Sequence, residues 1–598
     1  MERHIFDACR EIVDRAGEPE AIAFHGAFGE RANEACSAGD VELERVMRLV
    51  SGVFSMFSCE DPSQPFGPIA SFPDGTRTLI PEDLTEEELE DLEALIEASE
   101  NPVFVARIAD VLWIRRRNPA FARRAIRAYL VSAEMTEGDS WVPRRDSLRR
   151  AAQLASGLGR SAPERPVVRD MVVHLFKEAM GSCVSPEMGY WPAALAKILI
   201  ENELLDEWTS LGDACEKIAL RFPVTPGCDE PREYYELAAQ CYKLAKLPDQ
   251  VESMRLAIAS HWKAEAGAIK DAGGDALLIS NRLQGAIAAF RRTRSGQEGA
   301  KHLAVDLKKA QRKATGELRT LSAGLDVTQL VVEARERMAN KSGHDTIIAF
   351  LNLHRPVSYE SAREAAEKYL KEHPLQAMFT TNVLTPEGNV AATIPGAVDD
   401  PGAQLEKGVI QQYNVCQNLA GAVLLEEARS IIQGGADVTW KAAIQELIGE
   451  HPLIQSDRSQ LYSRAIFAGF EGDALVFLHL IIPQVEYLVR EALHRAGVQT
   501  TSMGAVGVQE ERDLNYLLRG EAAESILGKD LVWEMRSLLT EKGGPNLRNR
   551  LCHGLLRDSD FSQCHSTFLL WLALYLLVVT LSPRANGPQG VEGRSESV

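Results

Sequence analysis

The sequence predicts a mainly α-helical protein, and three observations indicate that class. Apolar residues recur at helical spacing along most of the 598 residues, and helix start and stop signals separate these segments. A single stretch, between residues 378 and 394, alternates as a β-strand does. In chain order we expect an N-terminal array of helical hairpins, a small β-hairpin insert and a C-terminal helical bundle.

Residues 1–340 carry the pattern of a helical-hairpin array. Thr85 and Glu88 form a capping box ahead of leucines at helical spacing. Asn118-Pro119 separates two further helices, because proline fits a first helical turn and disfavours helix before it. Small and aromatic residues between 233 and 262 have tetratricopeptide-like spacing, although no clean repeat of about 34 residues runs along the chain. We interpret this region as a tetratricopeptide-like sensor or scaffold.

Residues 341–454 form a predicted linker domain that contains the β-hairpin. The segment MFTTNVLTPEGNVAATIP alternates and is rich in Thr, Val and Ile. Its TPEG sequence supplies a turn in which Gly388 is free to adopt a positive φ. We therefore expect two paired strands near residues 378–394, followed by a loop and further helix.

Residues 455–582 are predicted to form a helical bundle with short connections. Its first long helix contains Pro483, where we expect a kink, and ends near Gly497. The apolar run Phe568–Leu581 is shorter than the roughly 18 residues of a membrane span. We interpret it as a buried bundle helix, with a membrane anchor as the alternative. Residues 583–598 lack apolar content and are predicted to be a disordered tail.

Composition and charge limit the classes of function. The formal net charge of −20 argues against a surface that binds nucleic acid everywhere, although it allows a local basic cleft. The ten cysteines include no C-x-x-C pair, so zinc-ligand spacing is absent and reduced thiols are the simplest account. The N-terminal residues have no signal-peptide apolar core. We expect a cytoplasmic protein that has no membrane as a partner.

The stretch NLRNRLCHGLL, residues 546–556, concentrates polar residues in the apparent opening turns of one helix. Asn546 is a candidate N-cap. Leu547, Leu551 and Leu555 form a narrow apolar stripe that we expect to face the bundle core. The positive end of the helix dipole lies at the start of this helix and is expected to favour an anion there.

Three side chains of this stretch suit phosphate chemistry. Arg548 is a permanent cation whose fork matches phosphate oxygens. His553 is able to transfer protons near neutral pH, and Asn549 can orient either group. Asn549 and His553 share one helix face, and Arg548 lies about 140° around from His553. No carboxylate cluster with metal-ligand spacing is nearby, so we expect a metal-independent reaction that needs no cofactor.

The same residues carry a family resemblance. Arg548 to His553 reads R-N-x-x-x-H, the signature of the HEPN superfamily (higher eukaryotes and prokaryotes nucleotide-binding domains). Together with IIPQVEYLVREAL and NVLTPEGNVAAT, the sequence resembles the uncharacterised branch that includes the endoplasmic-reticulum-membrane-associated RNA degradation protein. The HEPN-like part covers roughly residues 455–582, and the broader resemblance extends back through the hairpin.

The resemblance implies a HEPN-like bundle of four or five helices that forms a homodimer and cleaves RNA without a metal. On this model His553 acts as general base or acid, Arg548 neutralises the phosphorane, and Asn549 positions one of them. The product is a 2′,3′-cyclic phosphate, so only RNA is a substrate. Glu486 and Arg490, four apart on the first bundle helix, are candidates to support the arginine or histidine. A role in antiphage defence or toxin-like growth arrest is implied at family level.

Each of these hypotheses has an alternative. Arg548, Asn549 and His553 are also compatible with a solvated helix start, and Glu486 with Arg490 is more simply an intrahelical ion pair. The chain as a whole is alternatively a non-catalytic scaffold that binds a nucleotide or a protein.

The N-terminal helical region is a candidate site for a trigger, either a protein or a phage-derived molecule. Two basic stretches, residues 114–127 and 290–314, are candidate RNA guides, although ordinary solvated helix faces explain them better.

Overall fold

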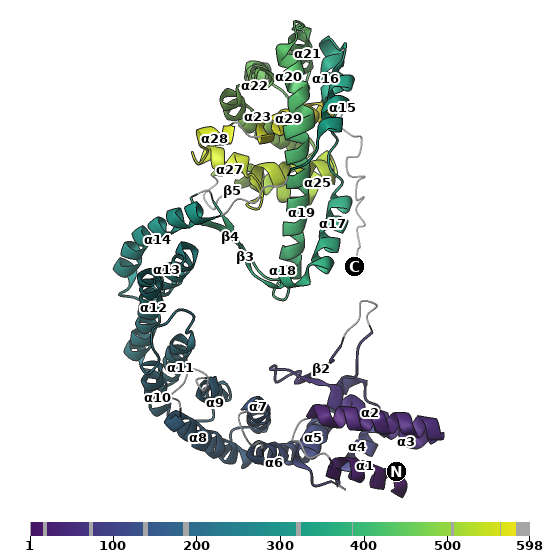
Figure 1. Cartoon of the computed structure of the whole chain (residues 1–598), viewed down its shortest axis with the longest axis vertical. Coiled ribbons are helices and arrows are strands. Elements are labelled where there is room, and N and C mark those ends of the chain that lie inside the picture. Colours follow the sequence, from purple (N-terminus) through teal and green to yellow (C-terminus); the bar gives the residue numbers. More distant parts are fainter. Residues whose placement is uncertain are drawn as a thin grey trace, which may run out of the picture. The chain divides into compact units, whose positions relative to one another are not determined.

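The computed structural model confirms the mainly α class. It describes residues 2–15, 21–70, 76–97, 99–135, 141–182, 190–318, 324–385, 387–503, 508–561 and 564–581. Within these ranges the strands form three small two-stranded antiparallel sheets. The chain divides into two compact units, Met1–Glu317 (unit 1) and Leu318–Val598 (unit 2). Figure 1 labels the elements of each unit.

Unit 1 is an array of helices in which neighbours in sequence pack together. Pairs in contact include α5 with α6, α6 with α7, and each successive pair from α10 to α14 (Figure 1). The helices are α1 (Arg3–Arg15), α2 (Ala21–Ala38), α3 (Val41–Ser55), α4 (Glu86–Glu97), α5 (Pro102–Arg116), α6 (Pro119–Met135), α7 (Trp141–Gly157), α8 (Glu164–Ser182), α9 (Tyr190–Glu201), α10 (Thr209–Ala219), α11 (Glu230–Leu244), α12 (Pro248–Asp271), α13 (Ala276–Arg291) and α14 (Gln297–Glu317). The short elements are β1 (Phe57–Ser58), β2 (Phe66–Gly67) and the 3₁₀ turn η1 (Pro81–Asp83).

Local signals in unit 1 act as predicted. The Thr85 backbone N–H donates to Glu88 Oε2 at 2.7 Å, and the Glu88 N–H donates to Thr85 Oγ1 at 3.3 Å, which completes the capping box of α4. Helix α5 ends at Arg116 and α6 begins at Pro119, and Asn118 caps α6 through the Ala120 N–H at 3.0 Å. The array of paired helices is therefore encoded locally.

Unit 2 holds the hairpin and the C-terminal bundle. Its elements before α23 are α15 (Thr328–Met338), α16 (Gly343–Leu351), α17 (Tyr359–Glu372), α18 (Pro374–Met378), β3 (Thr381–Leu384), β4 (Val390–Ile394), α19 (Pro401–Leu419), the π-helical η3 (Ala420–Leu425), α20 (Glu426–Gly434), α21 (Thr439–Gly449), the 3₁₀ turn η4 (Ser456–Arg458) and α22 (Ser459–Glu471). The later ones are α23 (Ala474–Arg495), β5 (Thr501–Met503), β6 (Gln509–Glu511), α24 (Leu514–Arg519), α25 (Glu521–Leu527), α26 (Lys529–Met535), the π-helical η5 (Arg536–Thr540), α27 (Leu547–Cys552), α28 (Asp558–Phe561) and α29 (Cys564–Leu581).

The predicted β-hairpin is present. Strands β3 and β4 pair antiparallel, with Thr381 opposite Ile394 and an irregularity after Val383. Gly388 takes a φ of 80°, as the turn requires, and its N–H donates to the Thr385 carbonyl at 2.8 Å. Pro386 of the predicted turn lies outside the described residues.

Helix α29 lies at the centre of the unit 2 core. Its residues from Phe568 to Leu574 are at most 2% exposed. It contacts α16, α19, α20, α22, α23 and η3, and Trp571 Nε1 donates to the Leu351 carbonyl at 3.0 Å. The predicted domain boundary between residues 454 and 455 falls within the unit 2 core, to which residues on both sides of it contribute. Whether either part folds alone stays a prediction. The tail, residues 583–598, lies outside the described residues.

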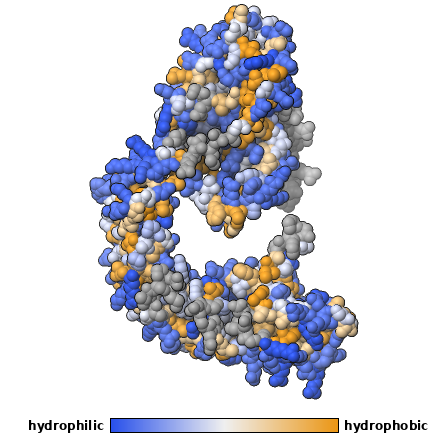
Figure 2. All heavy atoms as spheres, in the orientation of Figure 1, coloured by the Kyte–Doolittle hydropathy of each residue, from blue (hydrophilic) through white to orange (hydrophobic). Residues whose placement is uncertain are grey.

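Helix α29 is longer than the apolar run that predicts it. It begins at Cys564 and has 18 residues, so its length and composition would allow it to cross a membrane, the only such helix in the described residues. Yet most of this helix is buried within unit 2, as predicted for a bundle helix. Figure 2 shows hydrophilic side chains over much of the visible face of each unit, with smaller hydrophobic areas between them.

His451 predicts a pH dependence for unit 2. It is buried, its Nδ1 accepts from the Leu453 N–H at 3.2 Å, and its Nε2 contacts the Leu577 carbonyl at 3.0 Å and Thr580 Oγ1 at 3.1 Å. Burial, with the nearby charge of Arg495, lowers the pKa of this imidazole. The neutral ring is therefore the form that the fold accommodates.

We expect the free energy of unfolding to fall as the pH drops below about 6.5, the ordinary histidine pKa. Below that pH the unfolded chain binds a proton that the folded chain does not, so protonation favours unfolding. The slope from one such group is at most about 1.4 kcal/mol per pH unit. Urea unfolding followed by circular dichroism at pH 7.5 and 5.0 measures it, and His451→Gln should flatten the dependence. Equal pH slopes for both proteins would contradict the assignment.

Candidate functional site

The R-N-x-x-x-H stretch lies on a helix shorter than predicted. Gly544 precedes it in a turn where a Cβ would collide with the Ser537 carbonyl oxygen. Helix α27 spans only Leu547–Cys552, six residues. Gly554, at φ 66°, ends it, and the Leu555 N–H donates back to the Arg550 carbonyl at 2.8 Å. Six residues build only a weak dipole, so α27 supports an anion at its start less than a longer helix would, and an anion site there stays a prediction.

Two further expectations for this helix are corrected. Leu547 is buried and Leu551 packs partly against the core, but Leu555 is 50% exposed because the helix has already ended. Asn546 occupies the N-cap position in a left-handed conformation, yet its side chain does not cap the backbone. Its Oδ1 instead accepts from Asn549 Nδ2 at 2.7 Å.

Arg548 is held in place by two neighbours. Its Nε donates to Glu486 Oε2 at 3.0 Å, and one terminal nitrogen donates to Asn549 Oδ1 at 3.1 Å. Its side chain is 17% exposed. Burial opposes the charge of Arg548, but the hydrogen bond and charge of Glu486 outweigh it and raise the pKa. The guanidinium is thus a fixed, permanent cation.

Asn549 is surrounded by hydrogen-bond partners. Its Nδ2 donates to Asn515 Oδ1 at 3.2 Å and to Asn546 Oδ1 at 2.7 Å, and its Oδ1 accepts from Asn515 Nδ2 at 3.3 Å. Together with the bond from Arg548, these contacts saturate the amide. Asn549 therefore acts here as a rigid support.

Glu486 and Arg490 form the predicted intrahelical pair on α23, and Glu486 also reaches Arg548 of the motif. Arg490 donates to Glu486 Oε1 at 3.2 Å and to the Arg512 carbonyl at 2.7 Å. Glu486 therefore lies between two arginines, Arg490 and Arg548, and holds both. This contact of Glu486 with Arg548 is the kind of support that we predicted for the arginine of the motif.

His553 lies apart from the other motif residues. It is exposed at the end of α27, where its backbone N–H donates to the Asn549 carbonyl at 3.1 Å. Within the described part of the chain its imidazole makes no hydrogen bond or ion pair. The structure therefore brings Arg548, Asn549, Glu486 and Arg490 together and leaves the histidine ring free.

Charges around the motif are mostly paired with one another. Arg550 pairs with Asp560 at 2.8 Å and Arg519 with Glu541 at 3.2 Å. Arg512 lies over the Tyr516 ring, 3.8 Å from its centroid, and makes no ion pair with a described residue. Arg512 therefore keeps a charge that no carboxylate of the described residues pairs with, whereas Arg548 is paired with Glu486.

Sequence patterns did not indicate that Asn515, Asn546 and Asp513 belong to this cluster. Asp513 caps α24 through the Tyr516 N–H at 3.0 Å and accepts from Asn515 Nδ2 at 3.0 Å, which orients Asn515 toward Asn549. An Asp-x-Asn pair at a helix start is a recognisable capping signal, but only the fold places it beside α27.

The two basic stretches have partners for many of their charges. On α5 and α6, Arg116 pairs with Glu86 and Glu93, and Arg124 with Glu97. On α14, lysines pair with acids of the same helix, as Lys301 does with Glu298 at 3.3 Å. These contacts fit ordinary solvated helix faces.

The comparisons with known proteins found a match within unit 1. A family model described as a domain of unknown function (DUF7380) matches residues 6–167, from α1 to the start of α8. No curated protein and no solved structure is similar to the chain. The match does not reach the C-terminal residues that carry the HEPN resemblance and does not bear on it.

Proposed function

We propose that the chain is a metal-independent endoribonuclease of HEPN type, with its active site on α27. The observation that carries the proposal is the arrangement of the motif. Arg548 is fixed by Glu486 and Asn549, while the His553 imidazole stays exposed and makes no hydrogen bond in the described part of the chain. A preorganised cation and an unengaged imidazole are the two parts that phosphodiester cleavage requires.

In the proposed reaction the ribose 2′-oxygen attacks the adjacent phosphorus and the bond to the 5′-oxygen breaks. His553 accepts the 2′-hydroxyl proton, or donates one to the departing 5′-oxygen. Arg548 stabilises the charge of the phosphorane through its fork. The products are a 2′,3′-cyclic phosphate and a 5′-hydroxyl. DNA lacks the 2′-hydroxyl nucleophile and is not a substrate.

The contacts refine the role of Asn549. Its Oδ1 accepts from Arg548 at 3.1 Å, and its Nδ2 is engaged by Asn515 and Asn546. Asn549 is therefore proposed to position Arg548 rather than His553. Glu486 shares that role, because it fixes the opposite edge of the guanidinium.

The proposed site is built across a homodimer. Arg548 and His553 share no hydrogen bond within one chain, so a second copy of α27 is a source of the missing partner. Residues Phe568 to Leu577 of α29 are largely buried within unit 2 and offer little apolar surface to a second copy. The dimer proposal rests on the separation of the two motif side chains.

A non-catalytic scaffold is the second candidate function. The observation that favours it is the Glu486 carboxylate, which already offsets the charge of Arg548. On this alternative RNA or a nucleotide binds unit 2 without being cut. Incubation of the full chain with a labelled RNA and its DNA counterpart separates the two functions. RNA fragments that end in a cyclic phosphate support the nuclease, and retention of intact RNA supports the scaffold.

A prediction on cofactors follows from the same residues. RNA cleavage should be unchanged by excess EDTA, because Arg548, Asn549 and His553 supply the charge and the proton transfer themselves. The measurement is the initial cleavage rate with and without EDTA, in buffer treated to remove metal ions. A rate that collapses in EDTA and returns with Mg²⁺ would point to a metal-dependent reaction instead.

A further inference from the structure

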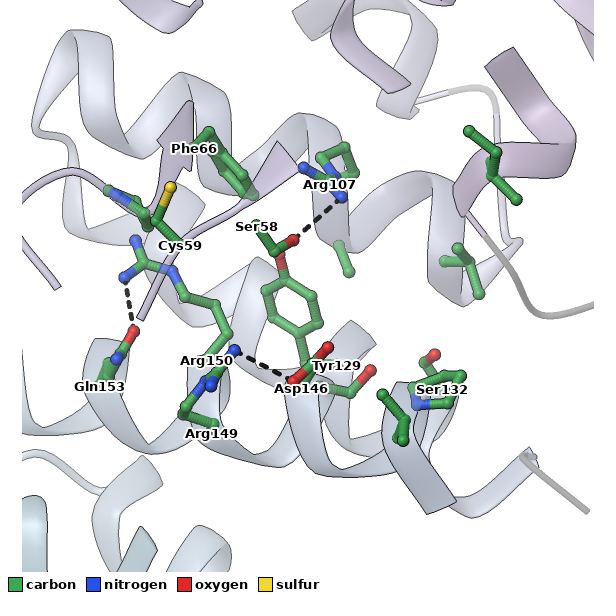
Figure 3. Close-up of a pocket in the computed structure, with 17 residues that line it drawn as sticks. Ser58, Cys59, Phe66, Arg107, Tyr129, Ser132, Asp146, Arg149, Arg150 and Gln153 are labelled. Atoms are coloured by element: carbon green, nitrogen blue, oxygen red, sulfur yellow. Dashed lines mark hydrogen bonds and ion pairs between the residues drawn. The ribbon is translucent and has the colours of Figure 1, made fainter. Parts of the chain in front are cut away.

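A cavity of about 280 Å³ lies within unit 1, inside the region that the DUF7380 model matches. Helices α5, α6 and α7 and the β1–β2 pair line it (Figure 3). The wall combines apolar and aromatic side chains with three arginines, Arg107, Arg149 and Arg150. This mixture of apolar wall and convergent polar groups is typical of a small-molecule site.

Arg107 is a buried cation without an acidic partner. It is 8% exposed, on a stretch of α5 whose neighbours are apolar. Its guanidinium donates to the Met56 carbonyl at 3.2 Å and to Ser58 Oγ at 3.4 Å, and lies 4.3 Å from the Phe66 ring centroid (Figure 3). It makes no ion pair with a described residue. Burial lowers its pKa, although the nearby charge of Asp110 opposes that effect.

The nearby carboxylates are already engaged. Asp110, fully buried, accepts from Arg150 Nε at 2.7 Å and from a terminal nitrogen of Arg150 at 2.8 Å. The Tyr129 hydroxyl donates to the same carboxylate at 3.0 Å. These bonds satisfy Asp110 and leave it turned toward Arg150. Asp110 thereby orients Arg150 in the cavity wall, and it makes no ion pair with Arg107.

The charged side chains at the rim of the cavity are likewise paired with one another. Arg149 bridges Glu60 at 2.9 Å and Asp146 at 3.0 Å, and Arg145 also pairs with Asp146 at 2.8 Å. In and around the cavity, Arg145, Arg149 and Arg150 pair with the carboxylates of Asp146, Glu60 and Asp110. Arg107 is the fourth arginine of this group and the one without a carboxylate partner among the described residues. Buried charges are almost always paired, because an uncompensated one strongly destabilises the fold. One negative charge is missing from this cavity.

We propose that the cavity binds a small organic anion whose carboxylate or phosphate group pairs with Arg107. The fork of an arginine suits either oxyanion. The rings of Phe66 and Tyr129, with Pro65 and Val103, provide an apolar wall for the body of the ligand. The cavity volume matches a ligand between an aromatic acid and a nucleoside monophosphate in size. This site is independent of the proposed RNA cleavage in unit 2.

Titration of the full-length protein tests the proposal with three probes, inorganic phosphate, benzoate and adenosine monophosphate. Calorimetry and the melting temperature both report binding. We expect saturable one-to-one binding of benzoate or the nucleotide, and weaker binding of phosphate, which lacks an apolar part. Benzoate and the nucleotide distinguish a carboxylate ligand from a phosphate ester. Failure of all three probes to bind would overturn the proposal.

Substitution of Arg107 gives the second arm. Arg107→Met should weaken binding at least tenfold, and Arg107→Lys, which keeps the charge without the fork, should weaken it less. Arg115→Met is the matched control, because this exposed arginine of the same helix also donates only to backbone carbonyls, those of Glu82 and Leu84. Binding that survives Arg107→Met unchanged would overturn the proposal.

The ligand-free proteins give a further readout. If Arg107 serves a ligand, Arg107→Met removes an uncompensated buried charge, so the melting temperature should hold or rise. If Arg107 is merely structural, the same change should lower the melting temperature, because it removes two hydrogen bonds and a ring contact. A lower melting temperature together with intact binding would exclude the ligand role.

Discussion

His553→Ala is expected to abolish RNA cleavage while leaving the fold intact. On the proposed mechanism the imidazole carries the proton transfer, a contribution on the order of 10²–10⁴-fold in rate. His553 is exposed, and within the described chain its ring makes no hydrogen bond, so its removal should cost little stability. The initial rate of cleavage of a labelled RNA measures the effect, and circular dichroism with thermal melting checks the fold.

His494→Ala provides the control for this experiment. His494 is also exposed, lies in the last turn of α23, and makes no hydrogen bond through its ring in the described residues. The His494→Ala protein should cleave RNA at the wild-type rate. A purified His553→Ala protein that cleaves as fast as His494→Ala would remove His553 from the mechanism and favour the scaffold.

Arg548→Ala is expected to lower cleavage by about 10²–10³-fold, the usual effect of removing a group that stabilises transition-state charge. The fold should tolerate it, because Glu486 keeps its bond to Arg490 at 3.2 Å and remains paired. Arg550→Ala is a matched control on the same helix, since Arg550 pairs with Asp560 rather than with the motif. It should leave the rate nearly unchanged.

Mixing the two inactive proteins tests whether the site spans a dimer. After subunit exchange of Arg548→Ala with His553→Ala, a mixed dimer holds one site with both residues. Activity should recover to about a quarter of wild type, because half of the dimers are mixed and each has one complete site. Proven exchange without recovery, or a monomer that cleaves RNA, would contradict the composite site.

Local features of the fold were readable from the sequence. The capping box at Thr85, the break at Asn118-Pro119 and the turn at Gly388 each depend on residues only a few positions apart. Their physical causes are backbone hydrogen bonds and allowed φ values, which nearby residues determine. The apolar run from Phe568 likewise predicted a buried helix because hydrophobicity alone requires burial.

Long-range features were not readable in the same way. The ion pair of Arg548 with Glu486 joins positions 62 residues apart, and no local rule selects that partner. Helix α27 ended early because Gly554 took a positive φ, although the leucine spacing continued past it. Arg107 and Asp110 were missed, yet two opposite charges three residues apart in the apolar run VFVARIADVLW are a signal that buried polar groups require partners.

The central position of α29 also affects how the protein is made. This helix follows every other described element, so the ribosome delivers it last. Until then, the nascent chain exposes to solvent the surfaces that α29 covers, such as those around Leu351 and His354. Unit 2 cannot close its core during synthesis of its earlier helices. A message truncated before the codons of α29 should therefore give a product that chaperones and proteases remove, with no partly active form.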